Sequence, residues 1–171
     1  RWGENFLLDP EARNGIVDLL ELGSGARVWE IGPGIGTLTA ELLRRGVTVT
    51  AFEVDQGMTR ILTRLFPTEK LRVVGGDVLK TWHAVRDEGE RPAAVVGNLP
   101  YRVAQSVIGE LLEAELMPRQ MVFTVQREVA ERIVAHPGGK AYSGFSVLVQ
   151  LAGWVRKHFD IAPGAFYPAP E

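Results

Sequence analysis

Short apolar runs alternate with amphipathic segments along most of this sequence. Runs rich in branched and aromatic residues predict strands at 27–31, 47–52, 71–74, 93–96, 120–125 and 155–161. A first helix is expected to start at the capping pair Asp9-Pro10 and to end at Gly23. Apolar residues at helical spacing predict further helices at 37–45, 56–66, 104–112, 127–135 and 143–154. Strands that alternate with helices indicate an α/β fold with a parallel sheet.

The composition is that of an ordinary globular protein and narrows the function only a little. The chain has 171 residues, 46% of them hydrophobic, and no apolar run approaches the roughly 18 residues that span a membrane. It has no cysteine, which excludes disulfides and fits a reducing cytoplasm. The three histidines show no metal-ligand spacing, so no metal site is predicted. The proline-rich residues 162–171 predict a loop without regular structure.

The net charge of −2 weighs mildly against a nucleic-acid partner. Basic residues nevertheless gather in the second half of the chain, where they could form a local basic face or simply solvated helix surfaces. They are Arg102, Arg119, Arg127, Arg132, Lys140, Arg156 and Lys157.

A glycine-rich turn follows the first predicted strand and opens a helix, the context in which such a motif binds a ligand. It reads Glu30-Ile31-Gly32-Pro33-Gly34-Ile35-Gly36. This spacing is tighter than the pattern that binds a pyrophosphate, and Pro33 removes one N–H donor that a phosphate would use. Because Glu30 adds a negative charge, the turn favours a cationic ligand.

Two acidic residues follow the next two predicted strands. Glu53 lies 21 residues after Gly32, where an acid can bind ribose hydroxyls, and Asp77 follows Gly75-Gly76, where an acid can accept from an adenine amine. Taken singly, each acid is more often a solvated loop residue or a helix cap. Together with the turn they predict a pocket for an adenosyl group that carries a positive centre, S-adenosyl-L-methionine.

The segment Asn98-Leu99-Pro100-Tyr101 follows the fourth predicted strand. An amide oxygen, a main-chain carbonyl held by a proline and an aromatic ring can together bind a flat base that bears an amine. We therefore expect the target base to bind at this turn, next to the cofactor.

These motifs together resemble the ribosomal RNA adenine dimethyltransferases, a family that includes small-subunit enzymes of the KsgA/RsmA type and the Erm resistance enzymes. The resemblance also rests on Gly3-Glu4-Asn5-Phe6-Leu7, Gln126-Arg127-Glu128-Val129, Lys140-Ala141-Tyr142 and Phe166-Tyr167-Pro168-Ala169-Pro170. It implies a Rossmann-like class I methyltransferase fold, mostly parallel, with helices on both faces of the sheet. Leu99 and the Lys140-Ala141-Tyr142 segment favour the small-subunit branch.

The resemblance also implies a role for each site residue. Asn5 and Leu7 would cover the methionine end of the cofactor, and Phe166 would close on the target adenine opposite Tyr101. The cofactor would be bound by Asn5, Leu7, Gly32, Glu53, Asp77 and Asn98. The catalytic set would be Asn98, Leu99, Pro100, Tyr101 and Phe166.

The implied activity is methyl transfer to N6 of two adjacent adenosines near the 3′ end of small-subunit 16S rRNA, in ribosome biogenesis. Its partner would be this rRNA within an immature 30S particle, and the protein would be a cytoplasmic monomer that binds no membrane. The alternatives are an Erm-type large-subunit methyltransferase, a non-catalytic small-subunit assembly factor, and a methyltransferase for DNA or a small molecule.

Two departures from the family pattern stand out: Glu4 replaces the usual Gln, and Arg102-Val103-Ala104 replaces Asn-Ile-Ser. Residues 1–171 are expected to be a truncated catalytic domain that lacks the last strand and a small helical C-terminal domain. Without that neighbouring strand, we expect the 155–161 segment to be displaced from the sheet.

Overall fold

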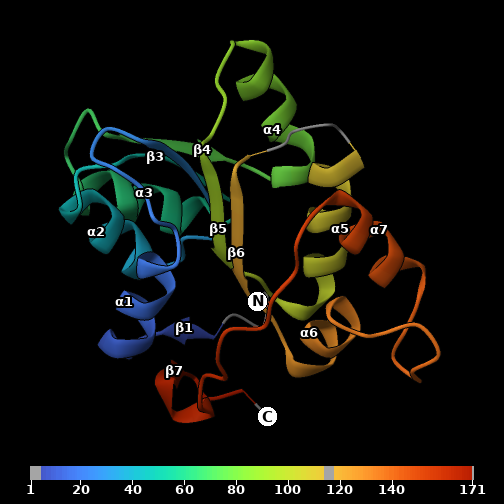
Figure 1. Cartoon of the computed structure of the whole chain (residues 1–171). Helices are drawn as coiled ribbons and strands as arrows, with labels where there is room; N and C mark the ends of the chain where they lie inside the picture. Colours follow the sequence, from blue (N-terminus) through green and yellow to red (C-terminus); the bar gives the residue numbers. More distant parts are fainter. Residues whose placement is uncertain (1–4, 114–117, 171) are drawn as a thin grey trace. The chain divides into compact units, whose positions relative to one another are not determined.

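A five-stranded sheet is the larger of the two sheets in the described chain (Figure 1). The structure, a computed structural model, describes residues 5–113 and 118–170, with the backbone alone for Tyr101 and Arg102. The strand order is β4-β3-β2-β5-β6, and the β2–β3, β2–β5 and β3–β4 pairs are parallel. The strands are β2 (Arg27–Ile31), β3 (Thr48–Glu53), β4 (Leu71–Gly75), β5 (Ala94–Asn98) and β6 (Gln120–Thr124). Five of the six predicted strands and the α/β class are therefore confirmed.

The chain divides into two compact units. The first contains residues 5–98, 118–123 and 161–170 of the described chain. Its helices are α1 (Pro10–Asp18), α2 (Thr37–Arg44), α3 (Gln56–Leu65) and α4 (Val78–Asp87). Aspartates cap three of them: Asp9 accepts from the Ala12 N–H at 2.7 Å, and Asp55 and Asp77 do the same for α3 and α4.

The core of the first unit packs α1 and α2 against one face of the sheet. Ile16 and Val17 of α1 and Leu38 and Leu42 of α2 share one cluster with strand residues such as Val49. Consecutive residues of β2 and β3 are buried, which means that both faces of these strands are covered. On the opposite face, Trp29 and Phe52 make an edge-to-face contact at 5.1 Å.

The second unit is helical and contains α5 (Tyr101–Glu113), α6 (Arg127–Ile133) and α7 (Gly144–Ala152). Helix α7 contacts both α5 and α6. Gln150 of α7 donates to the carbonyls of Ile133 and Ala135 at 2.9 and 2.8 Å, and buried Ser146 donates to that of Arg132 at 2.6 Å. Side chains of α7 thus hydrogen-bond to carbonyls at and just after the C-terminal end of α6.

Four expectations about the elements, including one for the C-terminal loop, are wrong or incomplete. The first helix, α1, ends at Asp18 and not at Gly23. Helix α4 was not predicted, although Val78, Trp82 and Val85 have helical spacing and the last two are buried. Residues 153–162, all of which the structure describes, lie in neither helix nor strand, so the strand at 155–161 is wrong. The consecutive polar residues 156–158 break the alternation that a half-buried strand requires. The five-stranded sheet does not include this segment.

The predicted loop at the C-terminal end contains regular structure. A short 3-10 helix (Pro163–Ala165) leads into β7 (Phe166–Tyr167), which pairs antiparallel with β1 (Phe6–Leu7) in a second, two-stranded sheet (Figure 1). Prolines flank β7 without interrupting it, because neither residue of the strand is a proline. The two ends of the described chain are thereby paired with each other.

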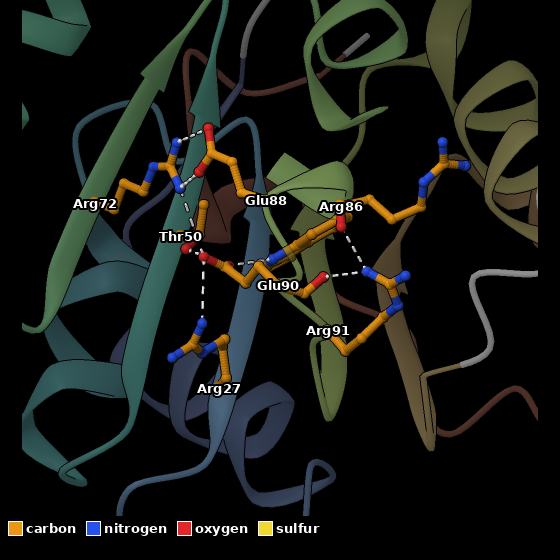
Figure 2. Close-up of polar contacts among 8 residues, drawn as sticks. Arg27, Thr50, Arg72, Arg86, Glu88, Glu90 and Arg91 are labelled. Carbon is orange, nitrogen blue, oxygen red and sulfur yellow. Dashed lines mark hydrogen bonds and ion pairs between the residues drawn. The ribbon is translucent and has the colours of Figure 1, made fainter. Parts of the chain in front are cut away.

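A buried carboxylate connects the segment before β5 to β2 and β3. Glu90 accepts from the Trp29 indole N–H at 2.6 Å and from the Thr50 hydroxyl at 2.7 Å. Arg27 and Arg72 both pair with Glu90 (Figure 2), and their nitrogens lie 3.4 and 3.8 Å from its second oxygen. Because the segment around Glu90 leads into β5, this cluster helps to fix the strand that ends at Asn98.

We expect Thr50→Val to lower the free energy of unfolding by about 1–2 kcal/mol, because a nearly isosteric change removes one buried hydrogen bond to a carboxylate. Urea denaturation of the chain measures this. Thr63→Val is the matched control, since the Thr63 hydroxyl bonds only its own helix on an exposed surface. Equal losses in the two variants would contradict a stabilising role for Thr50.

Candidate cofactor site

The strand register places four predicted site residues along one edge of the sheet. Ile31 of β2 is level with Phe52 and Gly97, and Glu53 of β3 is level with Gly75. Gly32, Glu53, Asp77 and Asn98 therefore all lie at the carboxyl ends of neighbouring parallel strands. In an open α/β sheet this edge is where ligands bind.

Two glycines of the turn face different surroundings. A Cβ added to Gly32, which is exposed, would approach only the Asn98 carbonyl oxygen, at 3.9 Å. A Cβ on Gly34, whose φ is +55°, would lie 2.9 Å from two ring carbons of Phe6. Gly34 is thus required by the aromatic ring of β1, whereas the space in front of Gly32 fits the close approach of a ligand.

The two predicted acids differ in their environment. Glu53 is 1% exposed, and its two oxygens accept from the Gly34 N–H at 3.1 Å and from the Asp55 N–H at 2.8 Å. It therefore links the turn to the end of β3. Asp77 is exposed and caps α4 by accepting from the Leu79 N–H at 3.0 Å. Each carboxylate oxygen that accepts one of these bonds keeps a second lone pair, with which it can still accept from a ligand. Binding of ribose by Glu53 and of adenine by Asp77 stays a prediction.

Glu30 is the most unusual titratable group at this edge. It is 1% exposed, its Oε2 accepts from the Thr39 hydroxyl at 2.6 Å, and its Oε1 has no hydrogen-bond partner among the described residues. Burial raises the pKa of Glu30 to about 7, against the lowering effect of Thr39, and the nearby charge of Glu53 adds to the rise. A carboxyl oxygen left without a partner fits a site for a cationic group. In the sequence, Glu30 stands out as an acid between the apolar residues of a predicted strand. It is not among the site residues that the sequence predicted.

The N-terminal segment contacts Asn98 directly. The Asn98 Nδ2 donates to the main-chain oxygen of Asn5 at 2.7 Å, and the Asn5 Nδ2 donates to the Pro168 oxygen, also at 2.7 Å. Leu7 is 3% exposed and belongs to the core cluster, so its side chain is occupied by packing. Phe166 is half-buried against the same cluster.

The remaining residues of the predicted base-binding turn belong to the second unit. The Leu99 N–H donates to Thr124 at 2.9 Å, and the Pro100 carbonyl accepts from the Val103 and Ala104 N–H groups at 3.1 and 3.2 Å, where α5 begins. The side chain of Tyr101 lies outside the described residues, as do Gly3 and Glu4. The roles predicted for Leu99, Pro100, Tyr101 and Phe166 stay predictions.

Of the basic residues in the second half, all but Arg102, whose side chain is not described, are exposed. Lys157 pairs with Asp160 at 2.8 Å. No helix in the described parts of the chain is both long and apolar enough to cross a membrane. Residues 5–113 and 118–170 contain no cluster of three or more histidines and acids that could hold a metal ion.

The sequence profile of the family described as "Ribosomal RNA adenine dimethylase" matches residues 1–171, the whole chain. The chain belongs to this family. Its proteins named "Ribosomal RNA small subunit methyltransferase A" include one from Treponema pallidum that is 46% identical over the whole chain and one from Borreliella burgdorferi that is 40% identical over 99% of it. The chain spans 59% of the length of each of these relatives.

Solved structures agree with the family and with the Rossmann-like methyltransferase fold. A dimethyladenosine transferase from Plasmodium falciparum matches 97% of this chain and 59% of its own, with a TM-score of 0.81 and 25% identity. The 23S rRNA methyltransferase ErmE matches 98% of this chain and 66% of its own, with a TM-score of 0.70 and 27% identity. Both solved structures thus share the fold of this chain.

Proposed function

We propose that residues 1–171 are the catalytic domain of an enzyme that transfers methyl groups from S-adenosyl-L-methionine to N6 of two adjacent adenosines near the 3′ end of small-subunit rRNA. The proposal rests on one observation above all. In a member of the rRNA adenine dimethylase family, Gly32, Glu53, Asp77 and Asn98 follow neighbouring parallel strands at one sheet edge. The product is dimethyladenosine, and the substrate is an immature 30S particle bound by a cytoplasmic monomer.

The residues at the sheet edge fit this cofactor. When bound, S-adenosyl-L-methionine supplies a methyl group activated by a sulfonium. The open space before Gly32 admits the ligand close to the backbone, and the carboxylates of Glu53 and Asp77 bind the ribose hydroxyls and the adenine amine. Leu7 lies on β1, Asn5 directly precedes this strand, and the Phe6 ring of the strand lies against Gly34 of the turn. Glu30 supplies negative charge near the turn once its carboxyl is ionised.

Asn98 and Leu99 prepare the target amine. The Asn98 amide oxygen and the Leu99 carbonyl accept hydrogen bonds from the adenine N6 amine, whose lone pair is otherwise delocalised into the ring. Two acceptors in these places favour a pyramidal, more nucleophilic nitrogen. Pro100 fixes the turn, and Tyr101 and Phe166 hold the base on its two faces once it leaves its stack. Catalysis is then mainly positioning.

An Erm-type large-subunit activity is the second candidate, because ErmE shares the fold with a TM-score of 0.70. The names of the curated relatives and Leu99 favour the small subunit. A third candidate is a small-subunit assembly factor that binds without methylating. The exposed basic residues would serve RNA binding in all three cases.

A substrate panel separates these candidates. The chain is incubated with radiolabelled cofactor and, in parallel, with undermethylated small subunits, large subunits and DNA. We expect label in small-subunit rRNA, recovered as dimethyladenosine. Label in the large subunit would favour the Erm-type activity, and binding of small subunits without label would favour the assembly factor. Label in DNA alone would contradict all three.

We expect Asn98→Ala to slow transfer about 100-fold, because it removes a group that stabilises the transition state more than the ground state. Single-turnover transfer to small subunits measures this. Asn14→Ala, on α1 in the same unit, is the matched control and should transfer normally. A rate for Asn98→Ala equal to that of the unmutated chain would overturn the role given to Asn98.

A further inference from the structure

We infer that Asn5 is a positioning residue that sets the orientation of the Asn98 amide and couples it to the 166–168 segment. The inference rests on the proposed function only for its catalytic consequence. The contacts themselves are within the first unit. They form a relay of two hydrogen bonds. Asn98 donates to the main-chain oxygen of Asn5, and the side-chain amide of Asn5 donates to the Pro168 oxygen.

The first step of the relay fixes which end of the Asn98 amide faces which way. A side-chain amide is planar, with a donor NH₂ at one end and an acceptor oxygen at the other. The main-chain oxygen of Asn5 can only accept, and it receives the Asn98 Nδ2 at 2.7 Å. A flipped amide would place two oxygens against each other. The contact therefore selects the orientation in which the Asn98 oxygen points away from Asn5, as an acceptor must to reach an amine.

The second step fixes Asn5 itself. Its Nδ2 donates to the Pro168 oxygen at 2.7 Å, across 163 residues of sequence. The residues that follow Asn5 are held by the two-stranded sheet, in which Phe6 and Leu7 pair with Tyr167 and Phe166. Next to this sheet, the Leu8 N–H donates to the Ala165 oxygen at 2.8 Å. The carbonyl of Asn5 is thus held between a side-chain bond and a short ladder.

Core packing anchors this pairing to the unit. Leu7 is buried in the core cluster, and the Phe6 ring lies against Gly34 at a distance that admits no side chain there. The strap formed by 5–9 and 163–168 therefore has a fixed place relative to both the glycine-rich turn and β5. A change in the backbone conformation at Phe166 would therefore alter the orientation of the Asn98 amide through Asn5.

The chain is well suited to a direct spectroscopic test, because it has three asparagines, Asn5, Asn14 and Asn98. Selective ¹⁵N labelling of asparagine side chains gives one NH₂ signal pair for each. Asn14 accepts from Arg13 through its oxygen, and its signal serves as the internal reference. In the unmutated chain we expect the Asn5 and Asn98 amide protons to exchange about tenfold more slowly than those of Asn14. Equal rates for Asn98 and Asn14 would overturn the inference without any variant.

Asn5→Asp is the isosteric variant that removes the donor to Pro168 but keeps the main-chain oxygen. We expect Asn98 amide exchange to accelerate about tenfold, and kcat for methyl transfer to fall about tenfold with a smaller change in KM for the cofactor. Asn5→Gln, which retains an amide donor, should recover part of both. Asn14→Asp should change neither.

The outcomes separate a positioning role from a cofactor contact. A raised KM for the cofactor, with unchanged kcat and unchanged Asn98 exchange, would show that Asn5 contacts the cofactor and does not position Asn98. Accelerated exchange in a chain that methylates no substrate would support the relay while contradicting the proposed function. Circular dichroism shows whether Asn5→Asp still folds. If it does not, the exchange rates of the Asn98 and Asn14 amides in the unmutated chain decide whether the inference holds.

Discussion

Gly36→Ala is expected to lower the free energy of unfolding by about 2–5 kcal/mol, the sum of a left-handed backbone and an overpacked contact. Gly36 has φ +83° at the start of α2, and an added Cβ would lie 2.6 Å from a ring carbon of Phe66 and 2.8 Å from Leu62 Cδ2. Leu62 is fully buried, so it has little space into which to move. Urea denaturation at constant pH, followed by circular dichroism, measures the change.

Gly25→Ala separates the two contributions. Gly25 has nearly the same backbone angle, φ +82°, but an added Cβ would meet nothing within 4 Å. We expect this control to lose only the backbone part, about 1–2 kcal/mol. The difference between the variants is then the cost of displacing Leu62 and Phe66. Equal losses would mean that the α3 side chains yield freely and that the turn is less constrained than its geometry indicates.

Local pattern was sufficient for the five-stranded sheet and for most helices, because each strand there is a short run rich in apolar residues, and β2, β3 and β5 are buried by their neighbours. The strand at 155–161 failed because three consecutive polar residues interrupt it, although Val155, Phe159 and Ile161 have strand periodicity. The pairing of β1 with β7 could not be read from sequence at all, since it joins residues about 160 positions apart. Two-residue strands carry no periodicity of their own.

The candidate site shows the same division. Spacing along the chain placed Gly32, Glu53, Asp77 and Asn98 at strand ends, and the register of a parallel sheet brings such ends together. The bonds that hold these residues were not predictable, because they depend on partners distant in sequence: Glu53 with Gly34, and Asn98 with Asn5. Glu30 was recognised only as a negative charge, and its burial appeared with the fold.

Glu30 should make the folded state less stable as the pH rises from about 4.5 to about 7. Its pKa is raised from the ordinary value of 4.5 to about 7 in the folded chain, so between these values the folded state binds more protons than the unfolded state. The free energy of unfolding therefore falls with rising pH in this window and levels off above it. A shift of this size corresponds to about 3 kcal/mol, at about 1.4 kcal/mol for each pH unit.

Glu30→Gln isolates this effect, because glutamine is neutral at every pH and nearly the same shape. We expect the variant to lack the fall and to be more stable than the unmutated chain at pH 8 by up to about 3 kcal/mol, with a much smaller difference at pH 4.5. Urea denaturation of both chains at several pH values measures the difference, in which contributions common to the two chains cancel. Glu41 does not disturb this comparison. Arg44 and Arg45 lower its pKa from 4.5 to about 2, so its contribution to the free energy of unfolding changes mainly below pH 4.5. Parallel stability curves for the two chains between pH 4.5 and 8 would show that Glu30 is ionised throughout, and the buried oxygen would then require a compensating charge at the sheet edge.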